Sequence, residues 1–227
     1  MSFEPVELQT ADGLVLRGER WQAGDDWLVL AHDAGEDLDA CRPLIGLAVH
    51  RGWSALALDL RGHGGSDDPW GEEACPRDVL AAIGEARARG ARAVCAIGAG
   101  AGAGAVLRAA PEAGPDALVL LSPGPLPQGR REEFRGAGIA KLIVYGSHSP
   151  RSDAAASEVA AASIGPVLRV GVPTAARGTG LLSGPTAAQA LEHIAAFWDE
   201  QRFLAGAPAG ATRLVPPGLE AVARPDR

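Results

Sequence analysis

Residues 91–105, ARAVCAIGAGAGAGA, decide the fold, because a short apolar run ends there in a series of alternating glycines. Residues 93–97 predict a buried strand, since the run is continuously apolar and bounded by turn residues. The alanine-rich stretch after Gly104 predicts a helix. A strand, a sharp glycine turn and a helix in succession can hold a phosphate at the helix N-terminus or a nucleophile on a strained turn.

The same alternation of strands and helices extends along the chain. Further strands are expected at residues 3–9, 14–21, 27–31, 54–60, 117–121, 141–145 and 167–170, and helices at 38–51, 76–89, 131–135, 152–164 and 186–204. The first two strands flank an Asp12-Gly13 turn, which is typical of a hairpin at a sheet edge. The pattern as a whole predicts an α/β fold: a mostly parallel, doubly wound sheet of about eight strands with this antiparallel hairpin and helices on both faces.

Length and composition favour one domain. The chain has 227 residues, and residues 1–204 suit a single α/β domain. The Pro-, Gly- and Ala-rich residues 205–227 are expected to form a tail that lies on the surface or is disordered. Only about 20 residues separate the strands at 117–121 and 141–145, which leaves little room for an inserted lid domain.

Charge and cysteine content limit the partners and the compartment. The formal net charge of −7 and the absence of a Lys/Arg run argue against a nucleic-acid partner. The three cysteines have no metal-ligand spacing and leave an odd thiol, which suits a reducing compartment. Neither a secretory signal nor an apolar span long enough for a bilayer is visible. We therefore expect a cytoplasmic protein with no membrane association, no metal and no cofactor, which binds a small molecule or a protein partner; its oligomeric state is not predicted.

Residues 27–67 carry a longer pattern, WLVLAHDAGEDLDACRPLIGLAVHRGWSALALDLRGHGGSD. A strand ends in the loop 32–35, a helix follows, and the next strand runs into DLRGHGGS at residues 59–66. This arrangement resembles the N-terminal half of the α/β-hydrolase superfamily, with its HGxG-like oxyanion loop and its D-x-R-G-H-G-x-S signature. The resemblance covers roughly residues 3–204. Within the superfamily, the chain is similar to the lidless, esterase- or dienelactone-hydrolase-like members. It implies the α/β-hydrolase fold.

The resemblance also implies three catalytic positions, each of which holds an unsuitable residue here. The nucleophile of G-x-S-x-G corresponds to Gly100 within GAGAG at residues 98–102. The acid, the last residue of a G-x-x-D pattern after strand 141–145, corresponds to Ser149. The base of an A-H-G-T-x-L-L segment corresponds to Arg177. Because losing one triad member costs orders of magnitude in rate, ordinary Ser-His-Asp hydrolysis is not expected.

Other side chains are weaker candidates for a nucleophile, acid or base. Ser122 ends a strand at the correct edge of the sheet but has no identified base, and Cys95 is expected in the buried core. His148 is next to the acid position, and Asp33 belongs to the oxyanion loop beside the expected pocket. Ser122, Asp33 and His148 are therefore the substitute catalytic candidates.

The altered turn also predicts a small anion-binding site. The N–H of Ala101 and an N–H of the loop at Asp33-Ala34 should converge over a helix N-terminus, and Arg177 adds a permanent positive charge. The predicted ligand-binding residues are His32, Asp33, Ala34, Gly100, Ala101 and Arg177. A dinucleotide site is the competing interpretation, since residues 98–103 match G-x-G-x-x-A, but the acidic residue expected at the end of the next strand is absent.

Three classes of function stay open on the sequence alone. We favour a non-hydrolytic pseudoenzyme that binds a partner or a small ligand, for which the predicted anion-binding site suggests a negative charge. The second class is an enzyme that uses the same pocket without a triad, with help from Asp33 or His148. The third is a hydrolase or esterase that acts through a displaced residue such as Ser122 or Cys95.

Overall fold

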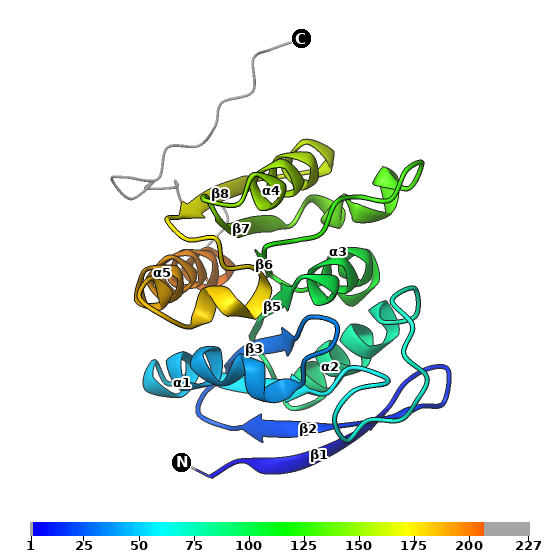
Figure 1. The fold of residues 1–227 in the computed structure, drawn as a ribbon. Helices are drawn as coiled ribbons and strands as arrows, with labels where there is room; N and C mark the ends of the chain where they lie inside the picture. The colour runs from blue at the N-terminus through cyan, green and yellow to red at the C-terminus, as the bar shows by residue number, and fades with distance from the viewer. Residues whose placement is uncertain (1, 207–227) are drawn as a thin grey trace.

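The apolar runs of the sequence form the central strands of an eight-stranded sheet in the computed structural model, which describes residues 2–206 (Figure 1). The strands are β1 (Glu4–Gln9), β2 (Val15–Trp21), β3 (Asp26–Ala31), β4 (Ser54–Leu58), β5 (Ala93–Ala99), β6 (Ala117–Leu121), β7 (Ala140–Gly146) and β8 (Val167–Val172). They lie in the order β1-β2-β4-β3-β5-β6-β7-β8. The β1–β2 and β2–β4 pairs are antiparallel and the others are parallel, which confirms the predicted fold class.

Helices cover both faces of this sheet (Figure 1). They are α1 (Arg42–His50), α2 (Pro76–Ala88), α3 (Ala101–Ala113), α4 (Pro150–Ala162) and α5 (Ala187–Gly206), with the short 3₁₀ helices η1 (Leu38–Cys41), η2 (Arg131–Phe134), η3 (Gly136–Gly138) and η4 (Gly178–Leu182). Helices α1 and α5 bury residues such as Leu44 and Trp198 in one apolar layer. Helices α2, α3 and α4 bury residues such as Ile83, Leu107 and Val159 in the other. Strands β3, β4, β5 and β6 are thus enclosed on both sides and buried along their whole length, as their mainly apolar sequences require.

The predicted boundaries differ most at the glycine turn. Helix α3 begins at Ala101 rather than after Gly104, and β5 extends to Ala99. The turn therefore consists of Gly100 alone. Close packing explains why the following residues look unlike a helix in sequence: a Cβ at Gly102 would lie 2.4 Å from the carbonyl oxygen of His32, so only glycine lets the first turn of α3 approach the end of β3.

The later connections are short. Residues 122–139, between β6 and β7, contain only η2 and η3 as regular structure, and the helix predicted over 131–135 is the 3₁₀ helix η2. Helix α5 continues to Gly206, two residues past the predicted domain end, and the rest of the predicted tail lies outside the described residues. Within residues 2–206, no helix has both the length and the apolar character needed to cross a membrane.

The strand order places one crevice at the carboxyl end of the sheet. Strand β4 pairs with one side of β3 and β5 with the other, so the chain leaves β3 and β5 in opposite directions. Ligands in open α/β sheets bind at such a reversal of strand order. The loop after β3, residues 32–35, and the turn after β5, Gly100, both lie there. The fold therefore brings together two segments that are far apart in sequence.

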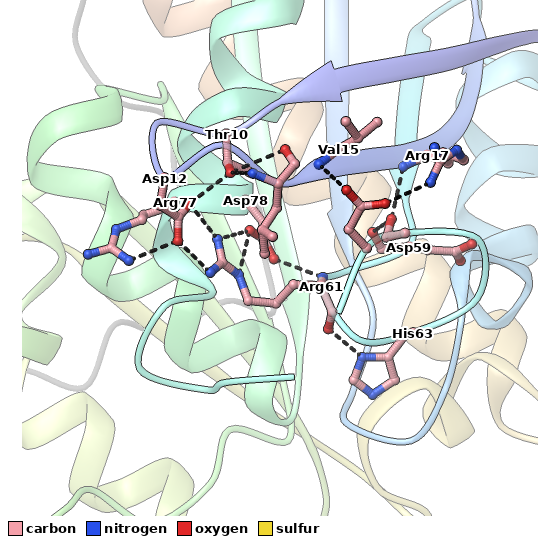
Figure 2. A network of polar contacts seen from close by, with 12 residues as sticks. Thr10, Asp12, Val15, Arg17, Asp59, Arg61, His63, Arg77 and Asp78 are labelled. Atoms are coloured by element: carbon pink, nitrogen blue, oxygen red, sulfur yellow. Dashed lines mark hydrogen bonds and ion pairs between the residues drawn. The ribbon is translucent and has the colours of Figure 1, made fainter. Parts of the chain in front are cut away.

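The DLRGHGGS motif is held by hydrogen bonds that support the fold (Figure 2). The carboxylate of Asp59 accepts hydrogen bonds from two backbone N–H groups. The guanidinium of Arg61 donates to Asp78 on α2 and to Asp12 in the β1–β2 turn, and these bonds hold the pKa of the Asp12 carboxyl well below its usual range. Arg61 and Asp78 are only 3% and 0% exposed, and Arg61 connects α2, through Asp78, with the N-terminal hairpin, through Asp12. The motif positions the fold and is not part of the crevice.

Candidate functional site

Gly100 forms the turn between β5 and α3 in a backbone conformation that favours glycine. Its φ is +48° and its ψ is −112°, and its N–H donates to the carbonyl oxygen of Leu121 at 3.0 Å. A Cβ built at this position would lie 2.0 Å from the carboxylate of Asp33. A side chain at residue 100 would therefore project into the crevice, toward Asp33.

The carboxylate of Asp33 fills the space in front of Gly100. Its Oδ1 accepts hydrogen bonds from the N–H of Ala101 and from the N–H of Ala34, both at 2.8 Å. Ala101 is the first residue of α3, so the carboxylate satisfies a free N–H at that helix N-terminus and interacts favourably with the helix dipole. The two N–H donors converge as the sequence predicts, but the oxygen between them belongs to the protein itself.

Further hydrogen bonds hold the loop that carries Asp33. The N–H of Asp33 donates to Glu36 at 3.1 Å, and the other carboxylate oxygen of Glu36 accepts a hydrogen bond from the hydroxyl of Thr179 on η4. The N–H of Gly35 donates to Nε2 of His63 at 2.9 Å. The loop after β3 is therefore connected to η4, which follows β8, and to the DLRGHGGS motif.

His32 lies beneath the crevice and not in it. The side chain is fully buried; its Nδ1 is 2.8 Å from the carbonyl oxygen of Asp33, and its Nε2 accepts a hydrogen bond from the N–H of Leu60 at 2.9 Å. This arrangement requires a neutral imidazole with its proton on Nδ1, and burial lowers the pKa of His32 accordingly. The expectation that His32 contacts a ligand is corrected here, since it has no accessible surface and serves to position the loop.

Of the three positions that the resemblance relates to a triad, two meet at the crevice. Arg177 lines the same cavity as Gly100. Ser149 does not; it is the N-cap of α4, where its hydroxyl accepts a hydrogen bond from the N–H of Ser152 at 3.3 Å. The neighbouring His148 is exposed and also lies outside the lining of the cavity. The segment that follows β7 therefore contributes neither of these side chains.

A cavity of about 230 Å³ lies beside Gly100, at the carboxyl ends of β3, β5 and β6. Its charged lining residues are Asp33, Glu72, Arg151 and Arg177, and its apolar wall includes Leu107, Leu126, Phe134 and Val159. Of the predicted ligand-binding residues, Asp33, Gly100, Ala101 and Arg177 line it; Ala34 contributes only the N–H that binds Asp33. Sequence reasoning missed Arg151, Glu72 and the apolar wall.

Ser122, at the end of β6, also lines this cavity and has two unusual properties. Its φ is +43°, a strained value for a residue other than glycine. Its side chain is 2% exposed, and its Oγ has no hydrogen-bond partner within residues 2–206. Strained backbone and unsatisfied buried polar atoms collect at functional sites, but no histidine or carboxylate in the described part of the chain is hydrogen-bonded to this hydroxyl.

The thiols and the acidic groups give no further catalytic centre in the described part of the chain. Burial raises the pKa of Cys41 and of Cys75 to about 12 and also raises the pKa of Cys95, so none of them provides the thiolate that a nucleophile needs. No group of three or more His, Cys, Asp or Glu side chains that could hold a metal ion occurs among residues 2–206.

Of the comparisons with known proteins, the one with solved structures gives matches, and these share one architecture. No protein-family model and no curated protein matches the sequence. Among solved structures, the esterase Pf2001 of Pyrococcus furiosus matches with a TM-score of 0.75 at 17% identity, over 87% of this chain and 90% of that one. The chain has the α/β-hydrolase fold. The α/β hydrolase GrgF of Penicillium sp. sh18 (TM-score 0.74, 12% identity, 88% and 99% covered) and the esterase EaEST of Exiguobacterium antarcticum (0.70, 13%, 86% and 100%) match in the same way.

The α/β-hydrolase fold gives the contacts around Asp33 a specific meaning. In this fold the nucleophile lies at the turn between strand and helix, and the oxyanion hole consists of the N–H of the next residue and an N–H from the loop after β3. Gly100 lies at that turn, and Ala101 and Ala34 supply N–H groups of these two kinds. Oδ1 of Asp33 accepts hydrogen bonds from both of these N–H groups.

Proposed function

We propose that this α/β-hydrolase-fold protein is non-hydrolytic and binds a small molecule in the cavity beside Gly100. The observation that carries the proposal is the Asp33 carboxylate, whose Oδ1 accepts hydrogen bonds from the N–H groups of Ala34 and Ala101, the two groups that would form an oxyanion hole in this fold. An oxyanion hole accelerates acyl transfer by stabilising charge that develops on the substrate. Here a permanent negative charge already uses both donors, so a substrate carbonyl would have to displace it.

The other two positions at the cavity support the same conclusion. Gly100 offers no nucleophilic atom, and the space for one is filled, because a Cβ there would lie 2.0 Å from the Asp33 carboxylate. Arg177 stands where the resemblance implies a general base. A guanidinium stays protonated in proteins and has no acceptor atom, so Arg177 cannot take a proton from a nucleophile.

A second candidate function is hydrolysis through Ser122. The strained backbone and the unpaired, buried hydroxyl of this residue favour it. A serine hydroxyl, however, is a weak nucleophile unless an adjacent base accepts its proton, and Ser122 has no such neighbour within the described residues. Of the acid–base candidates from the sequence, Asp33 is at the cavity and His148 is not.

Fluorophosphonate labelling with mass-spectrometric mapping, together with a panel of short-chain p-nitrophenyl esters, tests the proposal. We expect no covalent adduct and a rate of ester hydrolysis that is the same for the wild type and for Ser122→Ala. An adduct on any residue, or hydrolysis that is lost in Ser122→Ala, would overturn the proposal in favour of the second candidate.

Binding in the cavity requires its own control. Gly104 on α3 lines the cavity, and a Cβ there would make an ordinary 3.5 Å contact with the ring of Phe134. The Cβ of Gly104→Leu is therefore accommodated, and the rest of the side chain should occupy part of the cavity. A helix interior also tolerates leucine better than glycine. A small molecule that raises the melting temperature of the wild type should leave that of Gly104→Leu unchanged; an equal shift in both proteins would place its binding elsewhere.

A further inference from the structure

The cavity is lined by the two arginines of the described chain that have no acidic partner. Every other arginine in residues 2–206 lies within ion-pair distance of an Asp or Glu side chain. Within residues 2–206, the side chains of Arg151 and Arg177 form neither an ion pair nor a hydrogen bond, and both residues are solvent-exposed. Carboxylates are plentiful in a chain with a net charge of −7, and yet none in the described residues pairs with either of these arginines. Both guanidinium groups are therefore available to a ligand.

Arg151 also occupies a position that helix electrostatics disfavours. It is the second residue of α4, where the partial positive charge of the helix N-terminus repels a cation. Asp153, in the same turn, pairs with Arg169 on β8 and not with Arg151. A negative charge supplied from outside the chain would relieve this repulsion.

Ser122 adds a third unpartnered polar group to the same lining. Ser122 is only 2% exposed, and its Oγ has no hydrogen-bond partner within residues 2–206. A hydroxyl left without a hydrogen bond at a buried site is destabilising unless a ligand or a water completes it. The cavity therefore combines two cations with one hydroxyl that can donate a hydrogen bond.

The rest of the lining limits the charge and size of the occupant. Glu72 and Asp33 also line the cavity, so the formal charges of its four ionised side chains cancel. Two N–H groups already bind the Asp33 carboxylate, and a ligand with one negative charge fits this balance better than a dianion. Leu107 and Phe134 belong to the apolar part of the lining. The volume of about 230 Å³ lies between the roughly 150 Å³ that accommodates benzene and the pockets of about 300 Å³ or more that bind drug-sized molecules.

We propose that the cavity binds a small organic acid with a single carboxylate and an apolar body, about ten non-hydrogen atoms in all. The carboxylate pairs with Arg151 and Arg177 in the geometry that guanidinium groups favour, Ser122 donates a hydrogen bond, and the apolar body packs on the wall of Leu107 and Phe134. This inference rests on the proposed ligand-binding function and adds the chemical class of the ligand.

Isothermal titration calorimetry with phenylacetate and octanoate tests the inference. We expect saturable binding of at least one of these acids with one site per chain, and at least tenfold weaker binding of the neutral analogues phenylacetamide and octanamide. Arg177→Gln and Arg151→Gln should each weaken binding of the acid at least tenfold. Arg89→Gln is the matched control, since Arg89 is exposed, pairs with Glu85 and is absent from the lining; its affinity should equal that of the wild type.

The inference is overturned if neither acid binds, if a neutral analogue binds as tightly as its acid, or if both arginine variants keep the wild-type affinity. Phenyl phosphate is the probe for the dianionic alternative, and tighter binding of phenyl phosphate than of phenylacetate also overturns the inference. These results differ from a failure of the proposed function itself, which is reported by a covalent fluorophosphonate adduct and not by the choice of ligand.

Discussion

Replacing Asp33 by alanine should lower the free energy of unfolding by about 1–2 kcal/mol. The residue caps α3 from a neighbouring loop: Oδ1 accepts the N–H of Ala101 and of Ala34 at 2.8 Å each. Loss of a capping side chain costs about 0.5–2 kcal/mol, and loss of a negative charge at a helix N-terminus about 0.3–1 kcal/mol. Water can enter the vacated space from the adjoining cavity, so the freed N–H groups do not incur the full penalty of burial without a partner.

Formate should partly repair the Asp33→Ala variant, because it is a carboxylate small enough to replace the missing one. With a dissociation constant of about 10 mM, about 100 mM formate would restore about 1.4 kcal/mol. The assay is urea denaturation in sodium formate and in sodium chloride of equal ionic strength. Asp39→Ala is the control, since Asp39 is exposed and pairs with Arg42 away from the site; it should respond to formate no more than the wild type. A variant as stable as the wild type, or an equal effect of formate on Asp33→Ala and wild type, would refute the stabilising role of the hydrogen bonds from Ala34 and Ala101 to Asp33.

Three further predictions concern the turn, the loop and the hairpin. Gly100→Ala should lower the free energy of unfolding by about 1–3 kcal/mol because of the φ of +48°, and further because the new Cβ displaces Asp33. A double-mutant cycle with Asp33→Gly, measured by urea denaturation, should therefore give a coupling energy of about 1 kcal/mol. Strict additivity would contradict the clash. Because burial lowers the pKa of His32, the unfolded chain takes up its proton first as the pH falls below the ordinary value of 6.5; stability should therefore fall below that pH, less steeply in His32→Gln, and equal slopes would contradict the neutral imidazole. Arg61→Met should cost about 3–5 kcal/mol in chemical denaturation by leaving the buried Asp78 carboxylate without its charged partner, and Arg61→Met/Asp78→Leu should recover part of that loss.

Much of the fold was predictable because its determinants are local. Apart from Asp26 and Ser54 at their first positions, the runs that form β3 to β6 are continuously apolar, and every residue in these strands is buried. The Asp12-Gly13 turn likewise predicts the hairpin from a few residues. The start of α3 was not predictable in this way: Gly102 lies within the helix because the backbone of β3 leaves no room for a Cβ, and that contact is set by tertiary packing.

The sequence predicts which backbone segments form the candidate site, but not that the Asp33 side chain binds between them. The motif pattern identifies Gly100, Ala101 and the loop at Asp33, but no sequence pattern states whether the Asp33 carboxylate turns toward the N–H groups or toward solvent. Arg151 was missed because it comes from a helix after β7 and meets the other residues only in the folded chain. One signal was present: an arginine directly after Ser149 and Pro150, at a predicted helix start, contradicts the preference for acidic residues there.

The contact between Oδ1 of Asp33 and the two N–H groups has a consequence for what this scaffold can become. In an enzyme, an interaction raises the rate only to the extent that it is stronger in the transition state than in the ground state. Here the same interaction is complete in the resting molecule, so its free energy contributes to the folding equilibrium and none of it is left for a reaction barrier. Replacing Gly100 by serine would therefore be insufficient to make a catalyst, because the Asp33 carboxylate would first have to leave the two N–H groups, and the loss of its hydrogen bonds would lower the stability of the protein.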